Sequence, residues 1–220
     1  MLGGLNIQFL VLGMVAMILS ITVHEYAHAR AAYLLGDDTA ARAGRMTLNP
    51  IPHIDIIGTI IIPIVAAIAG NIPLIGWAKP VPVMPVLFTR KLSMHKAHAI
   101  VAVAGPLSNL FLSLISAIIL KILTYNILPY SISNFLLTFF YILFFMNLGL
   151  CIFNLIPIPP LDGSKLLPVT LQSKLESIRP VSYFILIAIV YFAGGIISIP
   201  IHILATIISK VLGLGILGIG

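Results

Sequence analysis

The 220-residue chain alternates long apolar runs with short polar connectors. Residues 9–23 carry no charged side chain, and the apolar segment around them extends over residues 6–35 and ends at Gly36. A helix of that length exceeds the roughly 30 Å of hydrocarbon that a membrane span has to cross. Three later runs predict further membrane helices, at residues 97–120, 134–156 and 181–197.

The remaining segments are shorter or interrupted. Residues 56–69 are apolar but fall below the roughly 20 residues of a straight span, and they contain Gly58 and Pro63. Residues 71–85 carry four prolines, which predicts an irregular or strand-like connector. An apolar tail, residues 198–220, either crosses the membrane again or lies along the bundle.

Composition places the chain among membrane proteins. Hydrophobic residues make up 60% and charged residues 8%, against about 25% charged in soluble domains, and the mean hydropathy is +1.16. We expect one all-α polytopic domain over residues 1–220, with a core at about 5–195. Its helical bundle should hold about four to six membrane segments, with a re-entrant or irregular connector, in a lipid bilayer. The N-terminus lacks the basic start of a signal peptide, so the first segment should remain in the mature protein.

Ionisable side chains gather near the end of the first apolar segment, at residues 24–28 (HEYAH). On a helix, His24 and His28 share one face one turn apart, so their imidazoles can bind one metal ion. Glu25 lies one step round the helix and can take a proton from a water molecule on that metal. Because ionisable groups at membrane depth are costly and usually functional, the pattern predicts a catalytic zinc site.

A catalytic zinc site takes three protein ligands, so a third ligand must come from elsewhere. The candidates are Asp162, Asp55, His53 and the pair Asp37 and Asp38. Asp162 is favoured, because the prolines before it break a membrane segment and free its backbone to line a cavity. His53 and Asp55 lie in a connector and are interpreted as groups that support the ligands or gate the site. The Asp37–Asp38 pair follows a helix end, where a solvated turn accounts for it.

Two neutral amides, Asn109 and Asn154, lie in otherwise apolar runs. Each can form an interhelical hydrogen bond, worth less than about 1 kcal/mol on average. Each can instead orient the substrate backbone or stabilise an oxyanion. For Asn154, eight residues before Asp162, the second interpretation is favoured. For Asn109 both stay open, because Gly105 also predicts a close-packed helix face.

The formal charge of +6 comes from Lys and Arg scattered between apolar runs, which argues against nucleic-acid binding and for a role in membrane topology. If residues 56–69 crossed the membrane fully, Asp162 would emerge on the face opposite His24 and His28. We therefore expect this segment to enter the membrane and return on the same side. The zinc then lies near the cytoplasmic face, because the Lys and Arg on its side include Arg30, Arg42, Arg45, Lys79, Arg90, Lys91, Lys96, Lys165, Lys174 and Arg179.

With these residues placed, the chain resembles the site-2 protease family of intramembrane zinc metalloproteases. Residues 24–28 match its first motif, residues 105–109 (GPLSN) its middle motif, and residues 154–163 (NLIPIPPLDG) its third. Residues 48–59 and 76–82 are similar to a compact bacterial subgroup, and no PDZ or CBS domain is visible.

The resemblance implies zinc bound by His24, His28 and Asp162, with Glu25 as the general base. It also implies cleavage of transmembrane segments of other proteins and a place in the bacterial cell membrane. The rival hypothesis is a metal-binding membrane protein or carrier without hydrolytic activity, which has no need of a carboxylate beside its ligands. Another membrane-buried substrate would require the same site. The sequence leaves the substrate, the regulator and the oligomeric state open.

Overall fold

The computed structural model of the chain describes residues 7–69, 76–125, 129–192 and 194–214. These residues form helices and connectors without a strand, as the all-α prediction required. The α-helices are α1 (Ile7–Leu34), α2 (Thr39–Arg42), α3 (Ile62–Ala69), α4 (Met94–Leu123), α5 (Tyr130–Asn154), α6 (Val169–Ser177), α7 (Arg179–Phe192) and α8 (Gly194–Leu212). The short helical turns are η1 (Ile51–His53), η2 (Ile56–Ile61), η3 (Pro85–Leu87) and η4 (Asp162–Leu166).

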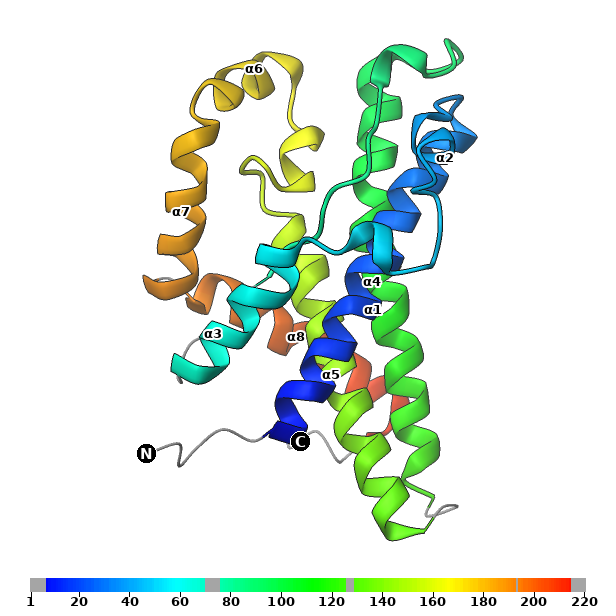
Figure 1. Cartoon of the computed structure of the whole chain (residues 1–220), viewed down its shortest axis with the longest axis vertical. Helices are drawn as coiled ribbons and strands as arrows, with labels where there is room; N and C mark the ends of the chain where they lie inside the picture. Colours follow the sequence, from blue (N-terminus) through cyan, green and yellow to red (C-terminus); the bar gives the residue numbers. More distant parts are fainter. Residues whose placement is uncertain (1–6, 70–75, 126–128, 193, 215–220) are drawn as a thin grey trace.

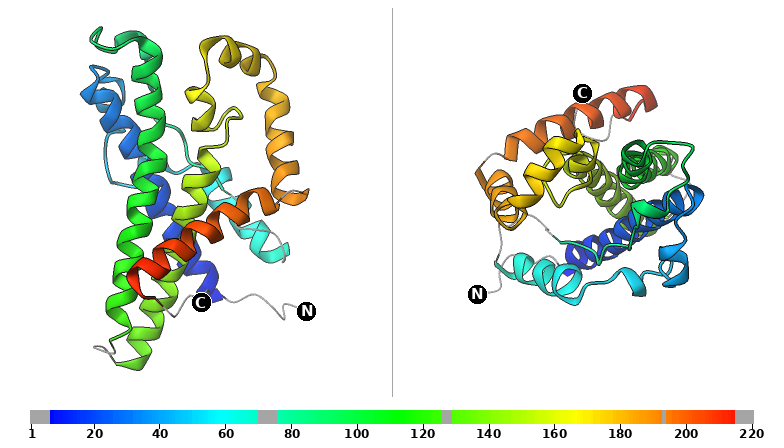
Figure 2. Two further views of the ribbon diagram at one scale, coloured as in Figure 1. Left: turned by 180° about the vertical axis from the view of Figure 1, so that it is seen from behind. Right: turned by 90° about the horizontal axis from the view of Figure 1, so that it is seen from above.

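Among the described residues, four helices are long and apolar enough to cross a membrane: α1, α4, α5 and α8. The first three lie side by side along the long axis of the molecule, and α8 runs obliquely across α5 (Figures 1 and 2). The apolar pattern thus located the first three spans to within a few residues, and the chain is an integral membrane protein.

Small side chains lie where these helices touch. Ala16 of α1, Ala117 of α4 and Ala205 of α8 have no exposed surface, and Ala117 and Ala205 pack in one cluster with Phe144 and Leu148 of α5. In a lipid bilayer, moving an apolar side chain from the lipid tails into a helix interface gains little free energy, because both surroundings are apolar. Association therefore depends on close packing, which small residues permit.

Two stretches after η1, residues 54–69 and 76–81, form the two arms of a hairpin. η2 is a π-helical turn, capped where Gly58 N–H donates to Asp55 Oδ1 (2.8 Å), and it continues into α3. On the return, Trp77 N–H donates to Gly58 O (3.2 Å) and Lys79 N–H to His53 O (3.0 Å). Residues 77 and 79 therefore lie beside residues 58 and 53, as expected if the segment enters the membrane and returns on the same side. Residues 70–75 lie outside the described part, and entry into a bilayer stays a prediction.

The predicted fourth span, residues 181–197, is wrong in its boundaries. α7 ends at Phe192, and α8 begins at Gly194. With 14 residues α7 is short for a span, and α8, with 19, is the candidate. Glycines are poor helix formers, and Gly194 and Gly195 are the first two residues of α8. Pro200 lies inside α8, seventh from its start, so the boundary predicted between residues 197 and 198 falls within a helix.

The solvated-turn interpretation of Asp37 is also wrong, because its side chain is buried. Its carboxylate accepts hydrogen bonds from Thr39 N–H (3.0 Å) and Met84 N–H (2.6 Å). Burial alone would raise the pKa of Asp37, but these hydrogen bonds outweigh it and hold that pKa below its usual value. Asp37 therefore ties the end of α1 to the connector before α4.

Candidate metal centre

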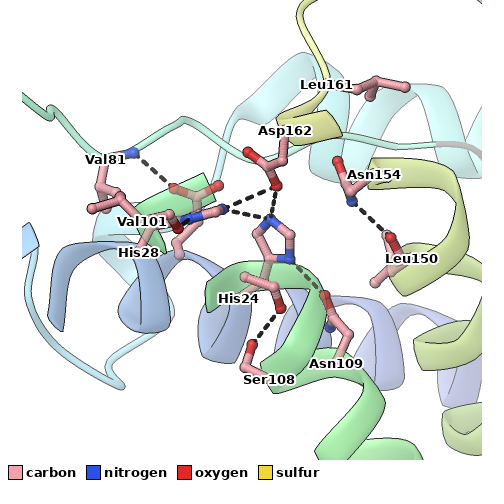
Figure 3. Close-up of polar contacts among 12 residues, drawn as sticks. His24, His28, Val81, Val101, Ser108, Asn109, Leu150, Asn154, Leu161 and Asp162 are labelled. Atoms are coloured by element: carbon pink, nitrogen blue, oxygen red, sulfur yellow. Dashed lines mark hydrogen bonds and ion pairs between the residues drawn. The ribbon is translucent and has the colours of Figure 1, made fainter. Parts of the chain in front are cut away.

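Two separate stretches bring the ligand candidates together (Figure 3). α1 supplies His24 and His28 from adjacent turns of one face. α5 ends at Asn154, and the chain turns back through a proline-rich loop to place Asp162 at the start of η4. A Cβ on Gly163 would overlap the backbone of Leu155, so the turn needs glycine beside the aspartate.

The three ligand atoms form a compact triangle. His24 Nε2 lies 2.9 Å from His28 Nε2, and Asp162 Oδ2 lies 3.2 Å from each. Ligands about 2.0–2.1 Å from a tetrahedral zinc ion lie roughly 3.3 Å from one another. Two imidazole nitrogens and a carboxylate oxygen are a usual zinc donor set, so this cluster fits a zinc ion with one position left open.

The other nitrogen of each imidazole is committed to a hydrogen bond. His24 Nδ1 donates to Asn109 Oδ1 (2.5 Å), and His28 Nδ1 donates to the Val101 carbonyl oxygen (2.7 Å). Both acceptors lie on α4. A proton held on Nδ1 leaves Nε2 free as a ligand and fixes the plane of the ring. The histidines are therefore oriented for metal by the protein itself.

Gly105 lets α4 approach the imidazoles. A Cβ at this position would stand 2.6 Å from His24 Nε2 and would overlap His28 Nε2 as well. Any other residue would push α4 away or displace both ligand atoms. The glycine of the GPLSN motif is thus required for space at the metal centre.

Glu25 lies beside the cluster and is 8% exposed. Its Oε2 accepts a hydrogen bond from Val81 N–H (2.7 Å), and its Oε1 accepts none from the described residues. Arg45 fixes the chain before Val81 by donating to Lys79 O (2.6 Å) and Pro80 O (3.1 Å). One oxygen of Glu25 is therefore anchored by the hairpin, and the other remains available.

A cavity of about 850 Å³ opens at the cluster. Its wall is formed by the ligands and Glu25, by residues 76–81 of the hairpin, and by side chains of α5 and α7. Figure 1 shows α7 standing opposite the group of α1, α4 and α5. The volume is within the usual range for ligand pockets, about 300–1,000 Å³.

The structure places the other predicted residues as follows. Asn154 lines the cavity and donates from Nδ2 to Leu150 O (2.9 Å). Asn109 is fully buried behind His24. His53 is fully buried and bonded through Nε2 to Thr47 O (2.9 Å), and Asp55, which lines the cavity, caps η2. Among the described residues, the group that could hold a metal ion is His24, His28 and Asp162, and it includes neither His53 nor Asp55.

Sequence reasoning missed two features of the cavity wall. His98 lines the cavity from α4, seven residues and two helical turns before Gly105, and that spacing could have revealed it. The second feature is the backbone N–H of Val81, which no pattern of side chains in the sequence can indicate.

Comparisons with known proteins agree with this chemistry. The family model described as Peptidase family M50 matches residues 12–197. The chain is 40% identical to "Putative zinc metalloprotease YwhC" of Bacillus subtilis over 184 residues, 81% of this chain and 78% of the relative. It is 28% identical to "Putative zinc metalloprotease Rip2" of Mycolicibacterium smegmatis over 146 residues, 66% of this chain and 52% of that protein. No solved structure matched the chain.

Proposed function

Because the chain belongs to peptidase family M50, the site-2 protease family of zinc metalloproteases, we propose that it hydrolyses peptide bonds in or near transmembrane segments of other membrane proteins. The observation that carries this proposal is the position of the metal cluster. Two of its ligands lie on α1, a helix long and apolar enough to cross a membrane, and face a cavity large enough for a peptide segment.

In the proposed mechanism His24, His28 and Asp162 hold the zinc ion. Zinc bound there supplies Lewis acidity, which polarises a peptide carbonyl and lowers the pKa of a water molecule. The residues of the chain then hold the ligand atoms in place and transfer the protons. Burial of both histidines, 8% and 7% exposed, limits competing water around them.

Glu25 is the proposed general base. Its carboxylate takes a proton from the attacking water and later delivers one to the leaving amine. The hydrogen bond from Val81 N–H to Oε2 keeps the side chain from rotating away, and Oε1 is the oxygen left for the proton. A positioned base of this kind contributes about 10²–10⁴-fold to the rate.

The two asparagines take different proposed roles. Asn109, buried behind His24 and bonded to its Nδ1, orients a ligand. Asn154 lines the cavity, and only one of its two Nδ2 hydrogens is used by the described hydrogen bond to Leu150 O. Its free donor and its Oδ1 remain available to the substrate backbone or an oxyanion.

Residues 76–81 form the proposed support for an extended substrate. Trp77 and Lys79 direct their N–H groups into the hairpin, and prolines stand at positions 80 and 82. The backbone N–H and C=O of Ala78 make no hydrogen bond among the described residues. A substrate helix that unwinds to expose a carbonyl can pair there in an extended form. On this proposal the enzyme works in the cell membrane of a bacterium, with its zinc near the cytoplasmic face.

The test compares Glu25→Gln with Glu176→Gln, since the chain has two Glu. We expect purified Glu25→Gln protein to keep its zinc and fold but to lose about 10²–10⁴-fold in cleavage of a model transmembrane substrate in detergent, because an amide cannot accept the proton. Glu176→Gln should cleave normally. Cleavage by Glu25→Gln at near the original rate would exclude the mechanism. A parent protein that binds zinc but cleaves nothing would favour the non-hydrolytic carrier.

A further inference from the structure

A group of polar side chains lies behind His24, on the side away from the cavity. Ser20 of α1, Asn109 of α4 and Asn147 of α5 are each fully buried. They connect the three helices at one level of the bundle. Asn147 belongs to none of the three motifs that mark the metal centre, so its polarity in an apolar core needs a separate explanation.

The hydrogen bonds of Asn109 fix the orientation of its carboxamide. Its Nδ2 donates to the Ser20 carbonyl oxygen (3.2 Å) and to Asn147 Oδ1 (2.8 Å). Both Nδ2 hydrogens are therefore used on oxygen atoms that can only accept. The remaining atom, Oδ1, is left facing His24 Nδ1.

This orientation decides which nitrogen of His24 carries the proton. A carboxamide oxygen can only accept, so His24 Nδ1 must donate, and the lone pair of the neutral ring is then on Nε2. Nε2 is the atom that faces His28 Nε2 and Asp162 Oδ2. If the Asn109 carboxamide were turned over, its NH₂ group would face Nδ1 and favour the tautomer with Nε2–H, which cannot bind metal.

Asn147 is the side chain that opposes this reversal, together with the Ser20 carbonyl oxygen. Its own Nδ2 donates to Ser20 Oγ (2.9 Å) and to Leu143 O (2.8 Å), so its Oδ1 points towards Asn109. We infer that Asn147 is a positioning residue: it orients the carboxamide of Asn109 and thereby holds His24 in the tautomer that binds zinc. This inference rests on the proposed function, in which His24 is a zinc ligand.

If Asn147 only held the helices together, its replacement would leave zinc affinity unchanged. Buried polar groups can hold helices together without affecting a metal. Ser116 of α4 is a matched case, since it is also fully buried but its Oγ donates to Leu112 O of its own helix (2.8 Å). Ser116→Ala is therefore the control for loss of a buried polar group in the same bundle.

The experiment measures the zinc dissociation constant of the full-length protein in detergent, by competition with a chelator. We expect Asn147→Leu to bind zinc about 10–100-fold more weakly, the usual effect of losing a group that orients a ligand. Ser116→Ala should stay within about threefold of the parent, because the Ser116 hydroxyl bonds within its own helix. Asn147→Ala removes the oxygen that faces Asn109 without adding bulk. It is measured in place of Asn147→Leu if the Leu variant does not fold.

A double-mutant cycle separates positioning from packing. If Asn147 acts through Asn109, the effect of Asn147→Leu on zinc affinity should disappear in an Asn109→Ala background. An unchanged affinity in Asn147→Leu, or a loss of the same size in both backgrounds, would overturn the inference and leave the proposed function intact. Zinc binding in His24→Ala as tight as in the parent would overturn both, because His24 would then not be a ligand.

Discussion

The two parts of the metal cluster are built differently. His24 and His28 lie on a long helix, and each ring is held by a hydrogen bond from Nδ1 to α4. Asp162 is the first residue of the short turn η4, after a proline-rich loop; its side chain is 21% exposed, and its polar contacts among the described residues run to the two histidine nitrogens. The histidines are therefore preorganised by the protein, and we expect a bound zinc ion to fix the position of the aspartate more than that of the histidines. Metal affinity should be most sensitive to the packing around the histidines.

The largest expected effect comes from Gly105→Ala. The added methyl group would overlap both ligand nitrogens, so we expect at least about a 100-fold loss of zinc affinity and loss of cleavage. Metal analysis of the purified protein measures the first effect. Gly149→Ala on α5 is the matched control, because its new Cβ would meet Ile201 Cδ1 at an ordinary 3.8 Å. Normal zinc affinity in Gly105→Ala would show that the histidines are not held as tightly as their contacts suggest.

A smaller loss is expected for Asp162→Ala. This change removes one ligand and leaves the two histidines oriented by α4, so zinc should bind weakly but measurably. His53→Ala and Asp55→Ala, outside the triad, should keep zinc close to the parent content. Metal analysis of the three proteins makes the comparison. Zinc kept by Asp162→Ala and lost from Asp55→Ala would mean that the wrong carboxylate had been assigned.

The smallest effect concerns the helical turn that follows Asp162. Lys165 Nζ pairs with Glu176 Oε1 at 3.0 Å, and this contact lowers the pKa of Glu176 below its usual value. Because the pair is partly exposed, Glu176→Gln should cost less than about 1 kcal/mol of unfolding free energy and leave zinc binding unchanged.

The pH dependence of that small effect has a definite sign. A carboxylate with a lowered folded pKa contributes stability above its unfolded pKa, about 4.3, and loses it as the pH falls through the folded pKa. The difference in thermal stability between the parent and Glu176→Gln should therefore shrink below pH 5. A difference that grew on acidification would contradict the assignment of the pair.

The sequence was sufficient where the information is local. Two histidines four residues apart share a helix face whatever surrounds them, and the long apolar runs located α1, α4 and α5 to within a few residues. Asp162 could be favoured over other acids because prolines break the chain before it. These conclusions rest on helical geometry and on the cost of polar groups in lipid.

The sequence was insufficient where distant backbone or ambiguous apolar runs decide the outcome. The hydrogen-bond donor to Glu25 is a main-chain N–H 56 residues away, and no residue type in the sequence indicates such a donor. The helices after residue 178 form one nearly continuous apolar stretch, and its apolar pattern placed a boundary at residue 197, inside α8. The role of Asn147 depends on which atoms of two carboxamides face each other, which only the assembled helices determine.

The position of the ligands along α1 also sets a length scale for whatever chain the enzyme cleaves. His24 lies ten residues before Leu34, the last residue of the helix, which corresponds to about 15 Å along its axis. A polypeptide that descended the same distance in extended form would use about four or five residues, and a helical one about ten. Cleavage positions counted from the membrane surface of a substrate would therefore report whether it enters unwound or coiled.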